Sequence, residues 1–180
     1  MKKGILFVLL TISLLSVNAQ SVQFGIKTGV NLATLRGENL TNADVSSGIH
    51  IGGLVELKFT DKFSVQPEIL FSQLGTESGE EKLRLDYIAL PIMAKYYLLE
   101  GFSVSAGPQV SFLIYDQFTA PGASLNPNIE EFDFGLNFGF GYNFKSGIFF
   151  STRYSLGITA IQENPDLKNG NFQLSLGYQF

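Results

Sequence analysis

The sequence has 180 residues, of which 45 % are apolar, 13 % aromatic and only 16 % charged, and its formal charge is −4. It contains 17 Phe, 7 Tyr and 19 Gly but no Cys, which excludes disulfides, a thiolate nucleophile and a lipidated cysteine. The acidic balance argues against nucleic acid as a partner.

The N-terminus has the pattern of a secretory signal peptide. Lys2 and Lys3 form a positive region, residues 5–15 form an apolar core, and Ala19 supplies a small residue before a cleavage point. We predict that residues 1–19 are removed, which leaves residues 20–180 as one domain. The alternative is an uncleaved anchor, but the apolar core is short for a membrane helix, which needs about 20 residues.

From Val22 onward, apolar and polar residues alternate with the period of two that is typical of β-strands. The clearest segment is residues 132–144, where Phe, Leu and Tyr alternate with Gly, Asn and Asp. The expected strands are, in chain order, residues 22–33, 48–59, 63–74, 85–98, 102–115, 132–144, 147–159 and 171–180. Pro67, Pro91 and Pro108 lie inside three of them, and each predicts a bulge or a local break.

The links between these segments alternate in length. Residues 60–62, 99–101 and 145–146 are short turns, whereas residues 34–47, 75–84, 116–131 and 160–170 are long. Short turns on one side and long loops on the other are the plan of bacterial outer-membrane barrels. We therefore predict an all-β, transmembrane, eight-stranded antiparallel up-and-down β-barrel in the bacterial outer membrane, with both termini periplasmic.

Side-chain volume decides which face points outward. The interior of an eight-stranded barrel is just wide enough for side chains to fill it. The apolar face carries nearly all Phe, Ile and Leu, which is too bulky for that space, so we expect it to face lipid. Outward aromatic residues near the chain ends and short turns then form an interfacial girdle: Phe24, Phe59, Phe63, Phe102, Phe144, Tyr178 and Phe180.

Several phrases resemble the outer membrane protein beta-barrel domain family, which includes PorT-like proteins of the Bacteroidota. They are SVQPEILFSQLG (64–75), LDYIALPIMAKYY (85–97), SAGPQ (105–109) and LGYQF (176–180). The resemblance covers about residues 21–180 and implies an eight-stranded outer-membrane barrel. It also implies that Phe180 is the C-terminal signal read by the barrel-insertion machinery. Most members of this family have no assigned activity, and PorT is tied to protein secretion.

Charged residues on the inward face suggest a network inside the barrel. The inward set includes Lys27, Glu56, Glu68, Lys95 and Arg153, and we expect Lys27 and Arg153 to pair with the two neighbouring glutamates. A structural plug is the favoured interpretation of this set. The alternative is a narrow, charge-lined path for ions.

His50, the sole histidine, has Ser47 nearby and is the one candidate for catalysis, for example on lipids. No metal-ligand cluster and no phosphate-binding glycine loop occurs, so we expect no cofactor. The long links are acidic, with ten carboxylates against four basic residues: Glu38, Asp44, Glu77, Glu80, Glu81, Asp116, Glu130, Glu131, Glu163 and Asp166 against Arg36, Lys82, Arg84 and Lys168.

These features support three hypotheses for function. The leading one is a structural, adhesive or secretion-accessory barrel that acts through its acidic extracellular loops. The second is a narrow ion or small-solute channel, and the third is an outer-membrane lipid-modifying enzyme. The expected partners are outer-membrane lipid, the barrel-insertion machinery and an envelope protein at the loops.

Overall fold

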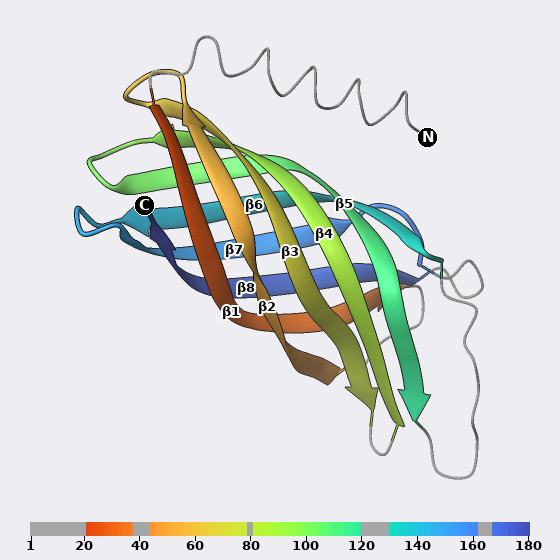
Figure 1. The fold of residues 1–180 in the computed structure, drawn as a ribbon. Helices are drawn as coiled ribbons and strands as arrows, with labels where there is room; N and C mark the ends of the chain where they lie inside the picture. Colours follow the sequence, from red (N-terminus) through yellow and green to blue (C-terminus); the bar gives the residue numbers. More distant parts are fainter. Residues whose placement is uncertain (1–20, 38–43, 79–80, 120–129, 162–166) are drawn as a thin grey trace, which may run out of the picture.

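The chain forms a closed barrel of eight antiparallel strands (Figure 1). The computed structural model describes residues 21–37, 44–78, 81–119, 130–161 and 167–180. Each strand pairs with the next, and β8 pairs back with β1, so the predicted up-and-down β-barrel is confirmed. The strands are β1 (Ser21–Gly37), β2 (Asp44–Lys58), β3 (Phe63–Ser78), β4 (Glu81–Tyr97), β5 (Phe102–Thr119), β6 (Phe132–Asn143), β7 (Ile148–Gly157) and β8 (Leu167–Gln179).

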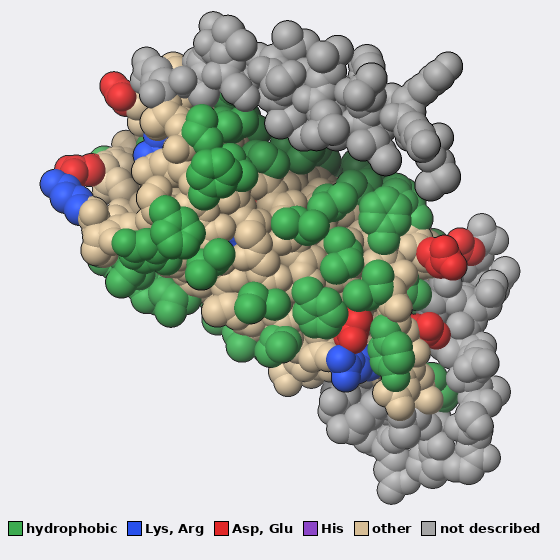
Figure 2. Space-filling view, in the orientation of Figure 1, with side chains coloured by type: hydrophobic (Ala, Val, Ile, Leu, Met, Phe, Trp, Pro, Cys, Tyr) green, Lys and Arg blue, Asp and Glu red, His purple; other side chains and the backbone are tan. Residues whose placement is uncertain are grey.

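The barrel is apolar outside and polar inside, because successive side chains of a strand point to opposite faces. In β8, Leu174 and Leu176 are exposed on the outer wall, whereas Gln173 and Ser175 are buried in the interior. Figure 2 shows apolar side chains spread over the barrel wall. Closure gives every strand a hydrogen-bonded neighbour on both sides, which is the condition for strands in lipid. Among the described residues, no helix is long and apolar enough to cross a membrane.

The three in-strand prolines interrupt the ladder without shifting its register. Between β2 and β3, the pairs Leu54–Glu68 and Leu57–Val65 are in the same register. The two positions of β3 between these pairs have no ladder partner on β2, and one of them is Pro67. Corresponding gaps follow Pro67–Ile92 in the β3–β4 ladder and Pro91–Gln109 in the β4–β5 ladder. Of the two predicted alternatives, the prolines therefore cause local breaks and not bulges. The register shifts lie elsewhere, between Val45 and His50 and between Asp86 and Tyr87.

The short turns gather at one end of the barrel, together with the C-terminus (Figure 1). Two of them use glycine at a positive φ, Gly101 (+81°) and Gly147 (+89°), where any other residue would be strained. An exposed ion pair of 2.9 Å joins Glu100 of one turn to Lys145 of another. The hydrogen bond and charge of Glu100 raise the pKa of Lys145 above its ordinary value. We call this the short-turn end and the opposite one the long-loop end.

At the long-loop end, several strands are longer than the sequence predicted. β3 continues to Ser78, β4 begins at Glu81 and β5 continues to Thr119, so residues that were assigned to loops belong to strands. β1, β2 and β8 are extended in the same way, whereas β7 ends early, at Gly157. As a result, β3, β4 and β5 project beyond the rest of the barrel (Figure 1). We call this part the projecting sheet.

Candidate functional site

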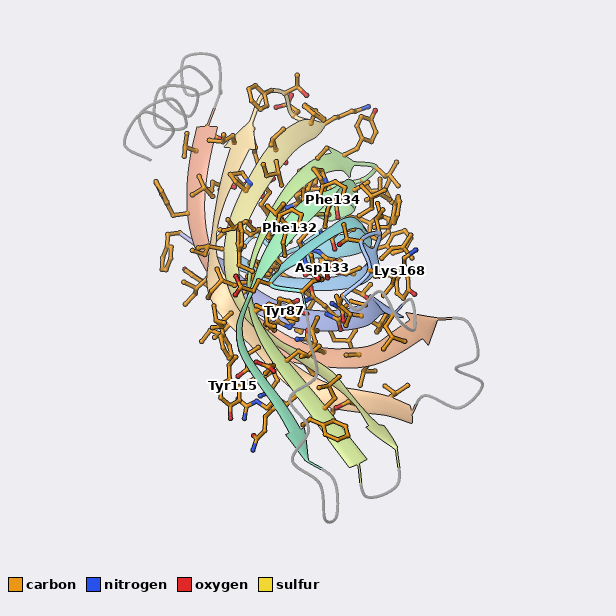
Figure 3. All side chains as sticks on the ribbon, turned by 90° about the vertical axis from the view of Figure 1, so that its right-hand side faces the viewer. Tyr87, Tyr115, Phe132, Asp133, Phe134 and Lys168 are labelled. Carbon is orange, nitrogen blue, oxygen red and sulfur yellow. The ribbon has the colours of Figure 1, made fainter. Side chains whose placement is uncertain are left out.

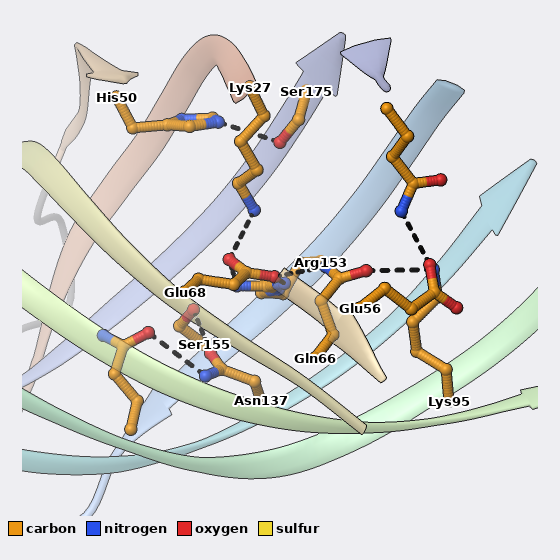
Figure 4. Close-up of polar contacts among 12 residues, drawn as sticks. Lys27, His50, Glu56, Gln66, Glu68, Lys95, Asn137, Arg153, Ser155 and Ser175 are labelled. Carbon is orange, nitrogen blue, oxygen red and sulfur yellow. Dashed lines mark hydrogen bonds and ion pairs between the residues drawn. The ribbon is translucent and has the colours of Figure 1, made fainter. Parts of the chain in front are cut away.

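Glu68 is the centre of one ion-pair cluster in the barrel interior (Figure 4). Its carboxylate lies 2.9 Å from Nζ of Lys27 on β1 and accepts two hydrogen bonds, of 3.0 and 2.6 Å, from the guanidinium of Arg153 on β7. All three side chains are buried. A bidentate contact of this kind fixes the relative orientation of the two side chains as well as pairing their charges. The cluster therefore ties β3 to β1 and β7 across the interior.

Glu56 is the centre of a second cluster, nearer the short-turn end. Its carboxylate pairs with Lys95 at 3.0 Å. It also accepts hydrogen bonds from the hydroxyls of Ser64 and Tyr97, both at 2.6 Å, and from the side-chain amide of Gln179 at 2.7 Å. Four donors thus replace the water that this carboxylate loses on burial.

Gln66 connects the two clusters. Its amide nitrogen donates to Glu68 at 2.7 Å, and its amide oxygen accepts from Lys95 at 3.0 Å. This arrangement corrects the predicted pairing, because Lys27 and Arg153 both contact Glu68, whereas Glu56 pairs with Lys95. The reason is register around the closed barrel, which places Glu68 opposite β1 and β7. Gln66 was not singled out from the sequence, although it shares the inward phase of Glu68.

His50 lies in a buried hydrogen-bond chain. The amide nitrogen of Asn31 donates to three other oxygens, so its Oδ1 accepts from Nδ1 of His50 at 2.9 Å. Nε2 of His50 then accepts from the hydroxyl of Ser175 at 2.8 Å. This is the hydrogen-bond order of a hydrolytic triad, but all three side chains are buried in the barrel wall and interior. The serine is not the expected Ser47, which is exposed, whereas both ring nitrogens of His50 bind other residues.

At the long-loop end of the interior, Asp133 is held by neutral groups. It accepts from the amide of Asn169 at 2.8 Å and from the hydroxyl of Thr159 at 2.9 Å. A cavity beside it measures only about 20 Å³, which is room for about one water. Apolar side chains, including Leu70 and Met93, fill the interior alongside the polar network. In the described part of the chain, no group of three or more His, Cys, Asp or Glu residues could hold a metal ion.

The aromatic residues assigned to the girdle lie on the outer wall, toward the short-turn end. Phe24 and Phe180 are the most exposed, at 61 % and 71 %, whereas Phe59 and Phe102 are half-buried. Ring pairs join Phe59 to Phe63 at 6.1 Å and Tyr178 to Phe180 at 5.4 Å between centroids. Phe144 and Tyr178 are exposed on the same wall.

On the projecting sheet, the pattern of the barrel wall is reversed. Its inner side is apolar, where Leu85, Tyr87, Ile161 and Leu167 form a buried cluster. Its outer side is polar, where Arg84 binds Asp86 at 2.7 Å. That hydrogen bond raises the pKa of Arg84 above its ordinary value.

This reversal is the arrangement of a water-exposed sheet packed on a small core. Figure 3 shows Tyr115 on the outer side of the sheet, whereas Tyr87 and Asp133 lie toward the interior. The reversed alternation of Leu83 and Leu85 with Arg84 and Asp86 was the signal that could have revealed these strand extensions in the sequence.

Acidic side chains lie exposed at the long-loop end (Figure 2). The structure describes Asp116, Glu130 and Glu131 there, and all three are exposed. The remaining carboxylates and two of the four basic residues assigned to the long links have side chains outside the described part: Arg36, Glu38, Asp44, Glu77, Glu80, Glu81, Lys82, Glu163 and Asp166. The signal peptide predicted for residues 1–19 also lies outside it.

The comparisons with known proteins agree with this architecture. The outer membrane protein beta-barrel domain family matches residues 18–163. No curated protein matches the chain significantly. Among solved structures, Ail, the attachment invasion locus protein of Yersinia pestis, is similar with a TM-score of 0.57 and 15 % identity, covering 89 % of this chain and 100 % of that chain. Ail is also known in complex with the heparin analogue sucrose octasulfate.

Neisserial surface protein A is similar with a TM-score of 0.60 and 9 % identity, over the same shares of the two chains. At these identities, the two likenesses concern the fold alone. The family match covers most of the chain, and it agrees with the apolar outer wall and the closed eight-stranded sheet. The chain therefore belongs to the outer membrane protein beta-barrel domain family and is an integral protein of the outer membrane.

Proposed function

We propose that this protein is a plugged barrel that anchors and displays a binding surface at its long-loop end. It would act as a structural, adhesive or secretion-accessory component of the envelope, with its short turns and termini in the periplasm. Removal of residues 1–19 as a signal peptide belongs to this proposal. Catalysis is the least supported function, because His50 and its partners are enclosed by the barrel.

The observation that carries the proposal is the filled interior. Two ion-pair clusters joined by Gln66 cross the space in which a pore would run. The cavity at the long-loop end holds about 20 Å³, far less than a continuous water path requires. A barrel of eight strands is expected to be filled in this way. Function would then depend on the surface at the long-loop end.

The acidic charge of the long-loop end favours one sign of charge on a partner. The segments assigned to the long links contain ten carboxylates against four basic residues. The Ail barrel has been crystallised with a polyanion, sucrose octasulfate. The opposite charge balance of this chain favours a cationic partner, since complementary potentials speed association and suppress wrong partners.

A narrow channel is the second candidate. Polar side chains line the interior from Gln179 near one end to Asp133 near the other. Within the described residues, Oδ1 of Asn171 and Oε1 of Gln173 are buried without a hydrogen-bond partner, as expected where a polar guest could be accommodated.

Conductance of the refolded protein in a planar bilayer tests the two candidates. We expect no steady openings from the unmodified protein, together with the heat-modifiable gel migration of a folded barrel. The triple variant Lys27→Ala, Glu68→Ala, Arg153→Ala removes one cluster and should introduce small, salt-dependent openings. Steady openings of the unmodified protein that change in Glu68→Gln would reject the plug and establish the channel.

A further inference from the structure

Asp133 differs from the other buried carboxylates in the charge of its partners. Three of the four buried carboxylates that the structure describes lie within 3.0 Å of a Lys or Arg: Glu56, Glu68 and Asp86. The two hydrogen bonds of Asp133 come instead from neutral groups, the hydroxyl of Thr159 and the amide of Asn169. A charge removed from water is normally paired with an opposite charge or bound to a metal ion. The negative charge of Asp133 therefore lacks a compensating cation among the described side chains.

The cavity beside Asp133 is small, and much of its lining carries oxygen. It measures about 20 Å³, so it has room for one water or for one ion that is no larger. Gly135 of β6 and Gly157 of β7 pair with each other and line the cavity, and they leave space because they carry no side chain. Side chains that carry oxygen line it as well, among them Tyr87, Ser111, Asp133, Asn137, Ser155 and Asn171. Oxygen ligands are those that hard cations prefer.

Asn171 supplies a free ligand in this cavity. It is 3 % exposed, and its Oδ1 has no hydrogen-bond partner among the described residues. Its amide nitrogen donates to Oδ1 of Asn31 at 3.4 Å, which orients the amide and leaves Oδ1 available. A buried oxygen without a partner is destabilising, so native structures usually satisfy it with water or a bound group. A cation in the cavity would bind this oxygen and would also compensate the charge of Asp133.

The charge and the size of the site select the ion. A single carboxylate among neutral oxygens is neutralised by one monovalent cation, whereas a divalent ion would leave an excess positive charge in a buried site. Sites for zinc and calcium typically combine several carboxylates, histidines or cysteines, and the described residues contain no such group. Of the two abundant monovalent metal ions, Na⁺ and K⁺, the smaller Na⁺ better fits a cavity of one water's size with oxygen ligands around it.

We propose that the cavity at the long-loop end of the interior binds one Na⁺ ion through the carboxylate of Asp133 and Oδ1 of Asn171. The hydroxyl oxygens of Tyr87 and Ser111, which line the same cavity, complete the coordination. Tyr87 also belongs to the buried cluster of the projecting sheet, so the ion connects that sheet to the barrel interior. This inference goes beyond the proposed function, because it assigns a stabilising ligand to the long-loop end.

The test measures how Na⁺ stabilises the full-length barrel refolded in phosphatidylcholine vesicles. Urea unfolding, read from heat-modifiable gel migration, is followed at increasing NaCl, and N-methyl-D-glucamine chloride keeps the ionic strength constant. A ligand that binds only the folded state lowers the unfolding equilibrium constant in proportion to its concentration once that exceeds Kd. We therefore expect each rise of about tenfold in Na⁺ above Kd to lower the unfolding constant about tenfold.

Two neutral replacements separate this site from the acidic surface. Asp133→Asn keeps the shape of the side chain but removes its charge, and it should abolish the dependence on Na⁺. Asp116→Asn, at an exposed aspartate of the same end, is the matched control and should keep the full dependence. If Asp133→Asn does not fold, Asn171→Leu provides the comparison, because loss of Oδ1 should weaken Na⁺ binding at least about tenfold.

Three results would overturn the inference. Unfolding midpoints of the unmodified protein that do not change with Na⁺ would mean that water fills the cavity. An undiminished dependence on Na⁺ in Asp133→Asn or in Asn171→Leu would place the ion elsewhere, and loss of the dependence in Asp116→Asn would place it on the surface. Bilayer current plays no part in this readout, so rejection of the Na⁺ site and rejection of the plug are distinguishable.

Discussion

At the residue scale, Glu68 shows how the interior is held together. It is a buried carboxylate that contacts cations from two distant strands, Lys27 of β1 and Arg153 of β7. Burial of charges is costly, and this cost is offset only while every partner remains in place. The stability of the barrel should therefore depend much more on Glu68 than on ion pairs at the surface.

Replacement of Glu68 tests this dependence. Glu68→Ala leaves two buried cations without a carboxylate and should lower the free energy of unfolding by about 3–5 kcal/mol. The measurement is a urea titration of the folded fraction, read from migration of unheated samples on gels. The control is Glu100→Ala, which removes an ion pair whose side chains are 80 % and 88 % exposed and should have no measurable effect. Similar midpoints for the two variants would contradict the proposed role of the cluster.

At the scale of elements, the projecting sheet is a separate packing unit. The wall below it is apolar outside, whereas the sheet has its apolar residues inside, around Leu85 and Tyr87. Such a unit can open locally while the rest of the barrel stays folded. Its few buried contacts make it sensitive to the loss of one large side chain.

Limited proteolysis tests this independence. Leu85→Ala creates a cavity in the cluster, where Leu85 is fully buried, and a core truncation of this kind costs about 2–5 kcal/mol. We expect trypsin to cut the variant after Arg84 while the protein keeps its heat-modifiable migration. Leu99→Ala, at a turn residue that is 72 % exposed, is the control and should resist trypsin as the unmodified protein does. Loss of the whole barrel in Leu85→Ala would show that the two parts do not unfold separately.

At the scale of the whole molecule, the change from apolar to polar outer side chains sets how far the barrel enters lipid. Phe138, 52 % exposed, lies in the middle of β6, whereas Gln117 is exposed on the projecting sheet. The first should face hydrocarbon and the second water. Positive charge at the two positions should therefore have different consequences.

Folding into lipid vesicles measures this difference. Phe138→Arg should cost about 2–4 kcal/mol of folding free energy, because an arginine at mid-depth must leave water. Gln117→Arg should cost about 0–1 kcal/mol, since its side chain stays outside the hydrocarbon. The readout is the folded fraction against urea for both variants in the same vesicles. An equal cost at the two positions would mean that the projecting sheet enters the membrane.

The sequence alone determined the features that depend on residues close to one another along the chain. Alternation such as that around Phe138 and Phe140 specifies a strand and its two faces, because successive side chains point to opposite sides. The volume of the apolar face then requires it to point outward. The eight strands, the closed sheet and the inward position of Glu56, Glu68, Lys95 and Arg153 follow from these two arguments.

Only the tertiary structure decided which distant residues meet and where the strands end. Glu68 contacts Lys27 and Arg153 because closure and register bring β1, β3 and β7 to the same level, and no local pattern encodes that level. The strand extensions escaped prediction because the alternation reverses where the strands leave the lipid. The extension of β5 beyond its last described pair with β6, Phe112–Phe132, is likewise a property of the paired strands and not of either one alone.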